Sequence, residues 1–511
     1  MKKIVLYTLL VFSFSSLSGC YWENFSKTER VEPLRLTAPD SIETLIDEVK
    51  SATQNGYRIR MTGSGHSHSD VAITEDILLR PIQLIDVLEI DRQRLYDPEE
   101  AQLVRVESGI TVRKLNSYLD TQELALPNMG GYDGQTIVGA TMTGTHGSGL
   151  KHGPMASQIV SLQIVVDDGR VLQLEPSNGI TNPDIFPGVL EENNSINVEL
   201  IQNDSLFNAA KISIGSMGIV YSVVLKTDRK FWLEEVRTLS TWKKVKAPGG
   251  FLDRLIKGLP LDDTEVQPEY YELQYNPYKV GGERSILITK RYKSYEPLTI
   301  DSERGQPGTT MLSGLITLLE KPLIWIVDNF QFIAPILVEQ SLKSQSDDSY
   351  KNISYKIFNI GIVNHTDAYA MEMGFDLNES IAAIERTFEL GEELRDNGIV
   401  HSAPVSIRFV KAADELIAMQ QDRDTMIIEF IMINGIKGDR ELFNTYSQTL
   451  MEEFQARPHW GLDFKLLQGS EWASTLFSEW EQWIQHYETM NPNGTFDGRV
   501  TDRLGISKNP R

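Results

Sequence analysis

Apolar positions early in the chain follow a helical spacing and then give way to short strand-like runs. Between Ile42 and Val49 they fall at i, i+3, i+4 and i+7, which predicts a helix that begins after Ser41 and ends near Asn55. Asp168-Gly169 between two apolar runs predicts a hairpin turn. In this first half, strands are predicted at 57–61, 77–79, 85–90, 103–107, 159–166, 171–174 and 219–226, and further helices at 111–124 and 205–211.

The pattern changes at about residue 230, where glycines become rarer and longer strands are predicted. These strands lie at 270–275, 285–292, 404–411 and 425–433, with helices at 378–395 and 440–456 among them. The mixture indicates a second α+β domain with an antiparallel sheet. Residues 311–338 are strongly apolar but carry Glu320, Lys321 and Asp328, which excludes a simple transmembrane span. They predict either a pair of covering amphipathic helices or a lid that faces a membrane or admits substrate.

Composition narrows the class of protein. The chain has 511 residues, 41% of them hydrophobic and 23% charged, so two or three ordinary packed domains are expected. A formal net charge of -22 repels phosphate backbones, which argues against nucleic acid as a partner. A single cysteine excludes an internal disulfide framework and any metal site that needs several thiolates.

The N-terminus has the order of a secretory signal. Lys2-Lys3 precedes an apolar run over 4–14, and small residues lead to Cys20. Leu-Ser-Gly-Cys at 17–20 resembles the bacterial lipobox, which implies a signal peptide at 1–19, acylation of Cys20 and a tether at 20–33. The expected location is then the bacterial cell envelope, with the protein anchored to a membrane on the periplasmic or outer-membrane side. The alternative is a buried free cysteine after a plain signal peptide.

Two glycine-rich stretches carry the candidate chemistry. Residues 62–70 and 129–149 combine bare backbone with hydroxyl side chains, an arrangement that cradles anions such as a pyrophosphate. The first stretch lacks the lysine of a P-loop and the spacing of the Rossmann fingerprint. Two such loops in one domain could hold a large, flat, doubly phosphorylated ligand. A metal site built from His66, His68, His146 and His152 is disfavoured, because glycine loops fix ligand geometry poorly.

These stretches resemble a known family. The residues 62–70, Gly-Thr-His-Gly-Ser-Gly at 144–149 and Ile-Gly-Ser-Met-Gly-Ile at 214–219 are similar to the FAD-binding domain of vanillyl-alcohol-oxidase-type flavoproteins, also called PCMH-type. The branch of D-arabinono-1,4-lactone oxidases and alditol oxidases looks most similar. The resemblance implies a two-subdomain FAD domain at 34–228, an α+β substrate or cap domain with an antiparallel sheet at 229–456, and a segment at 457–511 that closes on the flavin site.

The resemblance also implies roles for single residues. His66 matches the histidine that holds the flavin covalently in this branch, although a loop histidine with no such bond remains the alternative. Pyrophosphate contacts are expected from Ser64, Gly65, Ser67 and His68; contacts to the flavin and ribityl chain from Thr136, Gly139, Thr143, Gly144 and Thr145; and contacts near the adenine from Gly218 and Ile219.

The substrate side departs from the family pattern. Arg408 is kept, but Ser406 stands where the relatives have glutamate, and Leu462 stands where Pro-His-Trp-Gly continues with lysine. Residues 406 and 408 share one strand face, as do Glu429 and Ile431 on the next strand. The loss of both the glutamate and the lysine argues against a sugar lactone as substrate. We expect the carboxylate to have moved to Glu429, and the pocket and its substrate to be more apolar than in the sugar lactone and alditol oxidases. The alternatives are a solvated Glu429, or replacement of the missing lysine by Lys465. His459 of the Pro-His-Trp-Gly motif is a further candidate catalytic residue.

The resulting expectation is an FAD-dependent oxidoreductase. It transfers hydride from a CH–OH carbon of a small alcohol or lactone to flavin N5. Arg408 would stabilise negative charge on the flavin, and O₂ or a membrane quinone or cytochrome would take the electrons. One alternative is a flavin-binding lipoprotein that serves in electron transfer or binding without polyol oxidation. The other is a surface lipoprotein without flavin.

Overall fold

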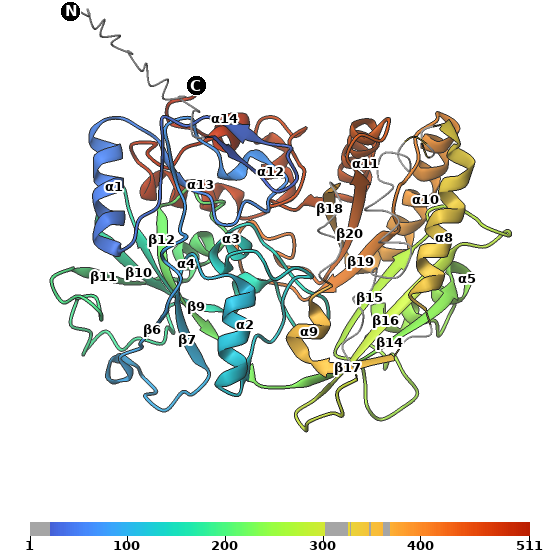
Figure 1. The fold of residues 1–511 in the computed structure, drawn as a ribbon, viewed down its shortest axis with the longest axis horizontal. Coiled ribbons are helices and arrows are strands. Elements are labelled where there is room, and N and C mark those ends of the chain that lie inside the picture. Colours follow the sequence, from blue (N-terminus) through green and yellow to red (C-terminus); the bar gives the residue numbers. More distant parts are fainter. Residues whose placement is uncertain (1–20, 302–324, 326, 328, 347–348, 361–367) are drawn as a thin grey trace, which may run out of the picture.

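The computed structural model describes residues 21–301, 325, 327, 329–346, 349–360 and 368–511. Two lobes lie side by side, each built on its own main sheet, and the C-terminal helices drawn in red return to the first lobe (Figure 1). The predicted α+β fold is confirmed. The predicted signal peptide and Cys20 lie outside the described residues.

The first lobe has two main sheets, which pack against each other through a shared hydrophobic core. Alternate residues of its central strands enter different cores: Ile164 and Val220 pack in one, whereas Val165 and Ile219 pack in the other. The six-stranded sheet has the order β11 (Val198–Gln202), β10 (Val171–Glu175), β9 (Ile159–Val165), β12 (Ile219–Lys226), β7 (Leu103–Glu107) and β6 (Val87–Leu88). The parallel sheet has the order β3 (Arg35–Thr37), β5 (Ile77–Leu79) and β4 (Ile59–Met61).

Polar side chains begin the helices of this lobe. Ser41, Thr111, Thr136 and Asn203 each accept a backbone N–H of the first helical turn, which satisfies a donor that has no partner within the helix. The helices are α1 (Ile42–Gln54), α2 (Val112–Thr121), α3 (Ile137–Met142) and α4 (Asp204–Lys211). Helix α3 was not predicted, and it begins inside the second glycine-rich stretch.

The second lobe is an antiparallel sheet of eight strands. Their order is β17 (Ser349–Ile353), β14 (Trp232–Thr241), β16 (Ser285–Ser294), β15 (Tyr270–Tyr275), β19 (Val405–Val410), β20 (Thr425–Ile433), β18 (Ala368–Asp376) and β21 (Arg457–Pro458). The register pairs Glu272 with Arg408, and pairs Glu429 with both Ser406 and Glu372. Since directly opposed residues point to the same face, the register gathers these side chains in one row.

The opposite face of this sheet is apolar and covered by helices. Ile407 and Phe430, which alternate with the polar row, belong to a core shared with three helices. These are α8 (Ala334–Ser344), α10 (Ser380–Asp396) and α11 (Asp439–Phe454). Shorter elements include β8 (Leu124–Ala125), β13 (Asp228–Arg229), α5 (Trp242–Val245), α6 (Phe251–Ile256) and α9 (Ser354–Phe358).

The C-terminal segment is fastened to the first lobe. It forms α12 (Glu471–Leu476), α13 (Trp480–Met490) and α14 (Arg499–Arg503). The indole Nε1 of Trp483 donates to the Ile212 carbonyl at 3.1 Å, and Arg503 pairs with Asp70 at 2.7 Å. The segment therefore closes on the domain that the glycine-rich loops belong to.

Residues 21–33, expected as a tether, are instead packed on the first lobe. They form the short pair β1 (Trp22–Glu23) and β2 (Arg30–Val31), and Trp22 and Val31 are buried with Ile73 and Leu78. The apolar side chains explain the difference, because a tether would expose them to water. Most of the predicted 311–338 helical region lies outside the described residues. In the part of the chain that the structure describes, no helix is both long and apolar enough to span a bilayer.

Candidate active site

A deep cleft in the first lobe brings the two glycine-rich loops together. It contains about 960 Å³ of space and is open to solvent at its mouth. Its wall includes most residues predicted to hold the cofactor: Ser64, Gly65, His66, Ser67, Thr136, Gly139, Thr143, Thr145, Gly218 and Ile219. Gly144 does not line the cleft; with φ of 78° it makes the turn that follows α3.

The loops fit an extended phosphate-bearing ligand. A Cβ atom on Gly63 would lie 2.8 Å from the Thr136 hydroxyl oxygen, and one on Gly139 would lie 2.7 Å from it, so only glycine allows this approach. Among the described residues, the backbone N–H groups of Ser64, His66 and Ser67 have no protein acceptor. Donors left free on a cleft wall suit phosphate oxygens, as in other backbone cradles. The residues present therefore fit the pyrophosphate of FAD.

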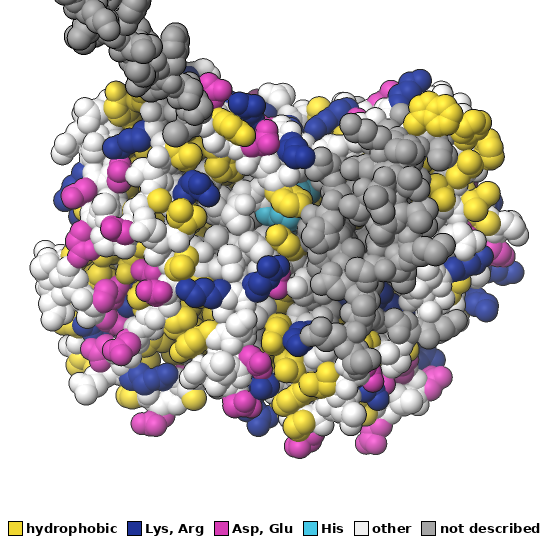
Figure 2. Space-filling model, viewed as in Figure 1, with side chains coloured by type: hydrophobic (Ala, Val, Ile, Leu, Met, Phe, Trp, Pro, Cys, Tyr) yellow, Lys and Arg dark blue, Asp and Glu magenta, His cyan; other side chains and the backbone are white. Residues whose placement is uncertain are grey.

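His66 lies where the cleft meets a second cavity, since it lines both. Its ring stacks on Tyr132 with centroids 4.2 Å apart and contacts Phe25 at 4.9 Å. Burial and the neighbouring charge of His68 lower the pKa of His66 to about 3, so its imidazole is neutral at physiological pH. On the face seen in Figure 2, a histidine side chain reaches the surface where the two lobes meet.

His68, predicted to contact pyrophosphate, lines the second cavity instead of the cleft. Its ring Nδ1 accepts the backbone N–H of Ala370 at 2.9 Å, and its backbone N–H donates to the Gly461 carbonyl at 2.9 Å. Burial lowers the pKa of His68 to about 4, which keeps Nδ1 free to accept. His68 thus ties the first glycine loop to β18 and to the C-terminal segment.

The second cavity lies against the polar row of the eight-stranded sheet. It contains about 1410 Å³ of space, also open to solvent, and adjoins the cofactor cleft at His66, Gln135, Thr145, His459 and Leu462. Ile431 and Leu462 line it, as expected of a more apolar pocket, but hydrogen-bonding side chains lie beside them. These are Arg237, Glu272, Gln274, Thr289, Gln345, Glu372, Ser406, Arg408 and Glu429.

Arg408 is the centre of this polar row. Its guanidinium lies 3.3 Å from Glu372, 3.6 Å from Glu429 and 3.8 Å from Glu272. Glu272 is also paired with Arg291 at 2.8 Å. Three carboxylates thus compete for one shared cation, so at least one of them is poorly compensated.

The poorly compensated carboxylate is that of Glu429. Burial raises its pKa to about 7, with the negative charges of Glu372 and Glu272 adding to the rise and Arg408 opposing it. Its side chain is still 18% exposed, so it is reachable from the cavity. Glu372 differs: burial acts to raise its pKa, but the charges of His146, His459 and Arg408 lower it to about 2. A carboxyl with a pKa near 7 suits a general base.

Glu372 was missed by the sequence reasoning. It is buried, and its Oε2 lies 3.2 Å from His146 Nε2 and 3.9 Å from His459 Nε2. A lone acidic residue inside the apolar run 368–375 was the available signal. These three groups could geometrically face one cation, but the Arg408 guanidinium already occupies the other oxygen of Glu372 and repels a metal ion.

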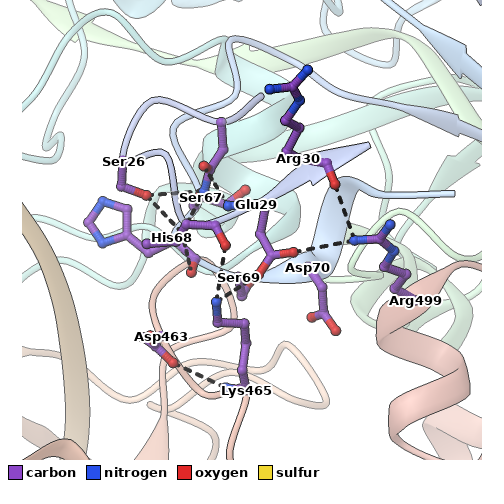
Figure 3. Close-up of polar contacts among 12 residues, drawn as sticks. Ser26, Glu29, Arg30, Ser67, His68, Ser69, Asp70, Asp463, Lys465 and Arg499 are labelled. Atoms are coloured by element: carbon purple, nitrogen blue, oxygen red, sulfur yellow. Dashed lines mark hydrogen bonds and ion pairs between the residues drawn. The ribbon is translucent and has the colours of Figure 1, made fainter. Parts of the chain in front are cut away.

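The remaining predicted residues divide clearly. Ser406 and His459 line the cavity, and His459 Nδ1 accepts the Gly461 N–H at 2.9 Å. Lys465 does not reach the cavity, so it does not replace the lysine absent at position 462. Its ammonium pairs instead with Glu29 of the N-terminal segment at 2.7 Å (Figure 3).

Comparison with known proteins supports the cofactor cleft. The FAD binding domain family matches residues 33–175, and the D-arabinono-1,4-lactone oxidase family matches residues 268–504. The L-gulono-1,4-lactone dehydrogenase of Mycobacterium tuberculosis is 24% identical over 94% of this chain and 98% of its own length. The L-gulonolactone oxidase of Mus musculus is 25% identical over 94% of this chain and 96% of its own length.

A further relative and a solved structure complete the comparison. A Neurospora crassa protein described as a D-arabinono-1,4-lactone oxidase is 31% identical over 90% of this chain and 81% of its own length. Cholesterol oxidase from B. sterolicum superposes with a TM-score of 0.71 at 13% identity, covering 95% of this chain and 96% of that chain, which shows a shared fold. From these matches and the cleft they map onto, the chain belongs to the D-arabinono-1,4-lactone oxidase family of FAD-dependent oxidoreductases.

Proposed function

We propose that this enzyme oxidises a CH–OH group of a hydroxylated compound such as a sugar lactone, with Glu429 as the general base. The observation that carries the proposal is the position of Glu429: it lies beside Arg408 in the cavity that adjoins the cofactor cleft, and its pKa is about 7. The lactone names of the relatives support the substrate class. The alternative of a binding subunit without oxidation is disfavoured, because such a subunit has no use for a buried, poorly compensated carboxylate.

Each side chain of the polar row has its own role in the proposed reaction. FAD, when bound, supplies a two-electron acceptor for the hydride of the substrate carbon. Glu429 Oε2 takes the hydroxyl proton of the substrate, and Arg408 holds that carboxylate and the substrate oxygen in place. Ser406, directly opposite Glu429 in the sheet, offers a hydroxyl to a second substrate oxygen. Gln274 and Thr289, further along the row, add hydrogen-bonding groups for a polyhydroxylated compound.

We also propose that His66 holds FAD covalently. Its place at the junction of cleft and cavity supports this assignment over His68, which lines only the cavity and whose Nδ1 is occupied by the Ala370 N–H. Flavin that stays with acid-precipitated protein, and is lost in His66→Ala, is the expected result.

We further propose that the enzyme is anchored at the bacterial envelope through Cys20 and passes its electrons to O₂ or to a membrane carrier. The lipobox resemblance supports the anchor. Exposed aromatic side chains in the described residues between 325 and 333, namely Trp325, Phe330 and Phe332, support contact with a lipid surface. Metabolic labelling with a fatty acid, compared between wild type and Cys20→Ala, tests the anchor.

One experiment tests the central proposal. Purified protein is mixed anaerobically with sugar lactones, alditols, simple alcohols and sterols, and the visible flavin absorbance is followed. Bleaching by a lactone or alditol is expected. If no compound bleaches the flavin while dithionite does, the proposed oxidation is refuted. Adding O₂, a quinone or cytochrome c after bleaching then identifies the electron acceptor.

A further inference from the structure

The N-terminal segment 22–31 is bonded to the loop that carries His66. The Phe25 N–H donates to the Gly65 carbonyl at 2.8 Å. The Asn24 side-chain amide donates to the Ser67 carbonyl at 2.9 Å, and the Thr28 hydroxyl donates to the His68 carbonyl at 3.2 Å. One short segment therefore holds the carbonyls of Gly65, Ser67 and His68, which come just before and just after His66. These bonds fix the backbone from which the imidazole projects.

The segment is itself held by the C-terminal segment, as Figure 3 shows, and by the second lobe. Glu29 pairs with Lys465 at 2.7 Å and with Arg499 at 3.6 Å, both from the C-terminal segment. The side-chain amide of Asn434, which follows β20 of the second lobe, donates to the Ser26 carbonyl at 3.0 Å. Because the segment contacts both lobes and the C-terminal segment, it fixes the loop relative to all three.

Aromatic rings add direct contact with the histidine and its neighbour. Phe25 lies 4.9 Å from the His66 ring centroid, and Tyr132 of the second glycine-rich stretch lies 4.2 Å from it. A Cβ atom on Gly65 would lie 3.1 Å from the Trp22 ring, so the indole packs on the bare backbone of the loop. Ring contacts of this kind each contribute about 1 kcal/mol and restrict the rotamer of the group they touch.

We propose that residues 22–31 are a structural part of the cofactor site, and that Phe25 is a positioning residue that holds the His66 imidazole in the one orientation from which it bonds to FAD. This inference rests on the proposed covalent attachment at His66. It assigns to the N-terminal segment a task that is separate from any anchor upstream of it.

The bonding step balances as an oxidation. An imidazole nitrogen of His66 loses its N–H hydrogen, a flavin methyl carbon loses one C–H hydrogen, and a nitrogen–carbon bond forms. The two hydrogens leave as protons, and the two electrons remain on the flavin until the enzyme's own electron acceptor removes them. The rate of this step depends on how often the imidazole is correctly placed, which is what a positioning residue changes.

The test uses Phe25→Ala and a matched control, Tyr57→Ala. Both side chains are 40% exposed aromatics of the first lobe, but Tyr57 lines neither the cleft nor the cavity. Full-length protein is produced without riboflavin, incubated with FAD, and sampled over time for total flavin and for flavin that survives acid precipitation. We expect attachment in Phe25→Ala to be about fivefold slower, the equivalent of ~1 kcal/mol, with total flavin unchanged.

Each outcome decides the matter. Slower attachment in Phe25→Ala, normal attachment in Tyr57→Ala and recovery in Phe25→Trp support the inference. Equal attachment rates in wild type and Phe25→Ala overturn it and leave the proposed function intact. Wild-type protein that binds FAD without an acid-stable bond overturns both the covalent assignment and this inference, and wild type that binds no FAD overturns the proposed function. Asn24→Ala, which loosens the loop without touching a ring, provides a second variant if Phe25→Ala does not fold.

Discussion

Glu429→Gln tests the proposed base, because it removes one charge and keeps the shape of the side chain. The glutamine cannot accept the hydroxyl proton, so substrate-dependent flavin reduction should fall at least tenfold, about 1.4 kcal/mol in activation free energy. Arg408 keeps two carboxylate neighbours in the variant, Glu372 at 3.3 Å and Glu272 at 3.8 Å. The site should therefore retain its structure, and the loss of rate should report the base alone.

The pH dependence of flavin reduction provides a second test of Glu429 as the base. Since Glu429 has a pKa of about 7 and works as a carboxylate, wild-type flavin reduction should rise with pH through about 7, and this limb should vanish in Glu429→Gln. Stability should change in the opposite sense. A carboxyl whose folded pKa is raised from 4.5 to about 7 contributes most below pH 4.5, and the contribution is lost as pH rises through 7, by at most about 3 kcal/mol. The variant should be the more stable protein at pH 8.

Anaerobic stopped-flow reduction at pH 5.5 to 9 measures the rate, and urea unfolding at pH 5 and pH 8 measures the stability. A position swap provides the rescue, because Ser406 and Glu429 are directly opposed in the register. The double variant Ser406→Glu with Glu429→Ser should recover part of the rate. A Glu429→Gln enzyme with wild-type rate and an unchanged pH limb would refute the assignment of the base.

Three further predictions follow from residues outside the base. Lys465→Met should leave flavin reduction within about twofold and lower stability by about 1 kcal/mol or less, because its ammonium does not reach the substrate cavity and its partner Glu29 is also held by Arg499; steady-state kinetics and thermal unfolding check this. Gly139→Val should sharply reduce bound flavin per protein, measured by absorbance, because even a Cβ atom would lie 2.7 Å from the Thr136 hydroxyl. Glu372, with its pKa lowered to about 2, should contribute stability above pH 4.5 that is lost as pH falls toward 2, so the stability gap between wild type and Glu372→Gln should shrink on acidification; a gap that stays constant would contradict the pairing.

Helices and strands were predicted well where neighbouring residues alone mark them, through apolar spacing or a cap. Helix α1 begins and ends where Ser41 and Asn55 indicate, and β5, β7, β12, β15 and β20 have their predicted bounds. Contacts between distant segments were not readable. Lys465 lies three residues from the position of the missing lysine, yet its partner is 436 residues away. Glu372 becomes part of the site only through the pairing of β18 with β20.

Strand β18 and the packed segment 21–33 were missed because neither has a periodic pattern of apolar and polar residues. In β18 both faces are buried, so its sequence lacks the alternation that marks a half-exposed strand. In segment 21–33 two-residue strands are too short to give any periodic signal, and their place depends on loop 64–68 and on the C-terminal segment. The motif resemblance located the cofactor loops, but it carried no information about the residues that hold them.

The closing role of the C-terminal segment has a consequence for how the holoenzyme is made. His68 of the first loop is bonded to the Gly461 carbonyl, and His459, Gly461 and Leu462 form part of the cleft wall. The coenzyme pocket is therefore incomplete until residues 459–462 have packed against the first loop. Loading of the coenzyme must then follow the docking of this C-terminal segment on the first lobe.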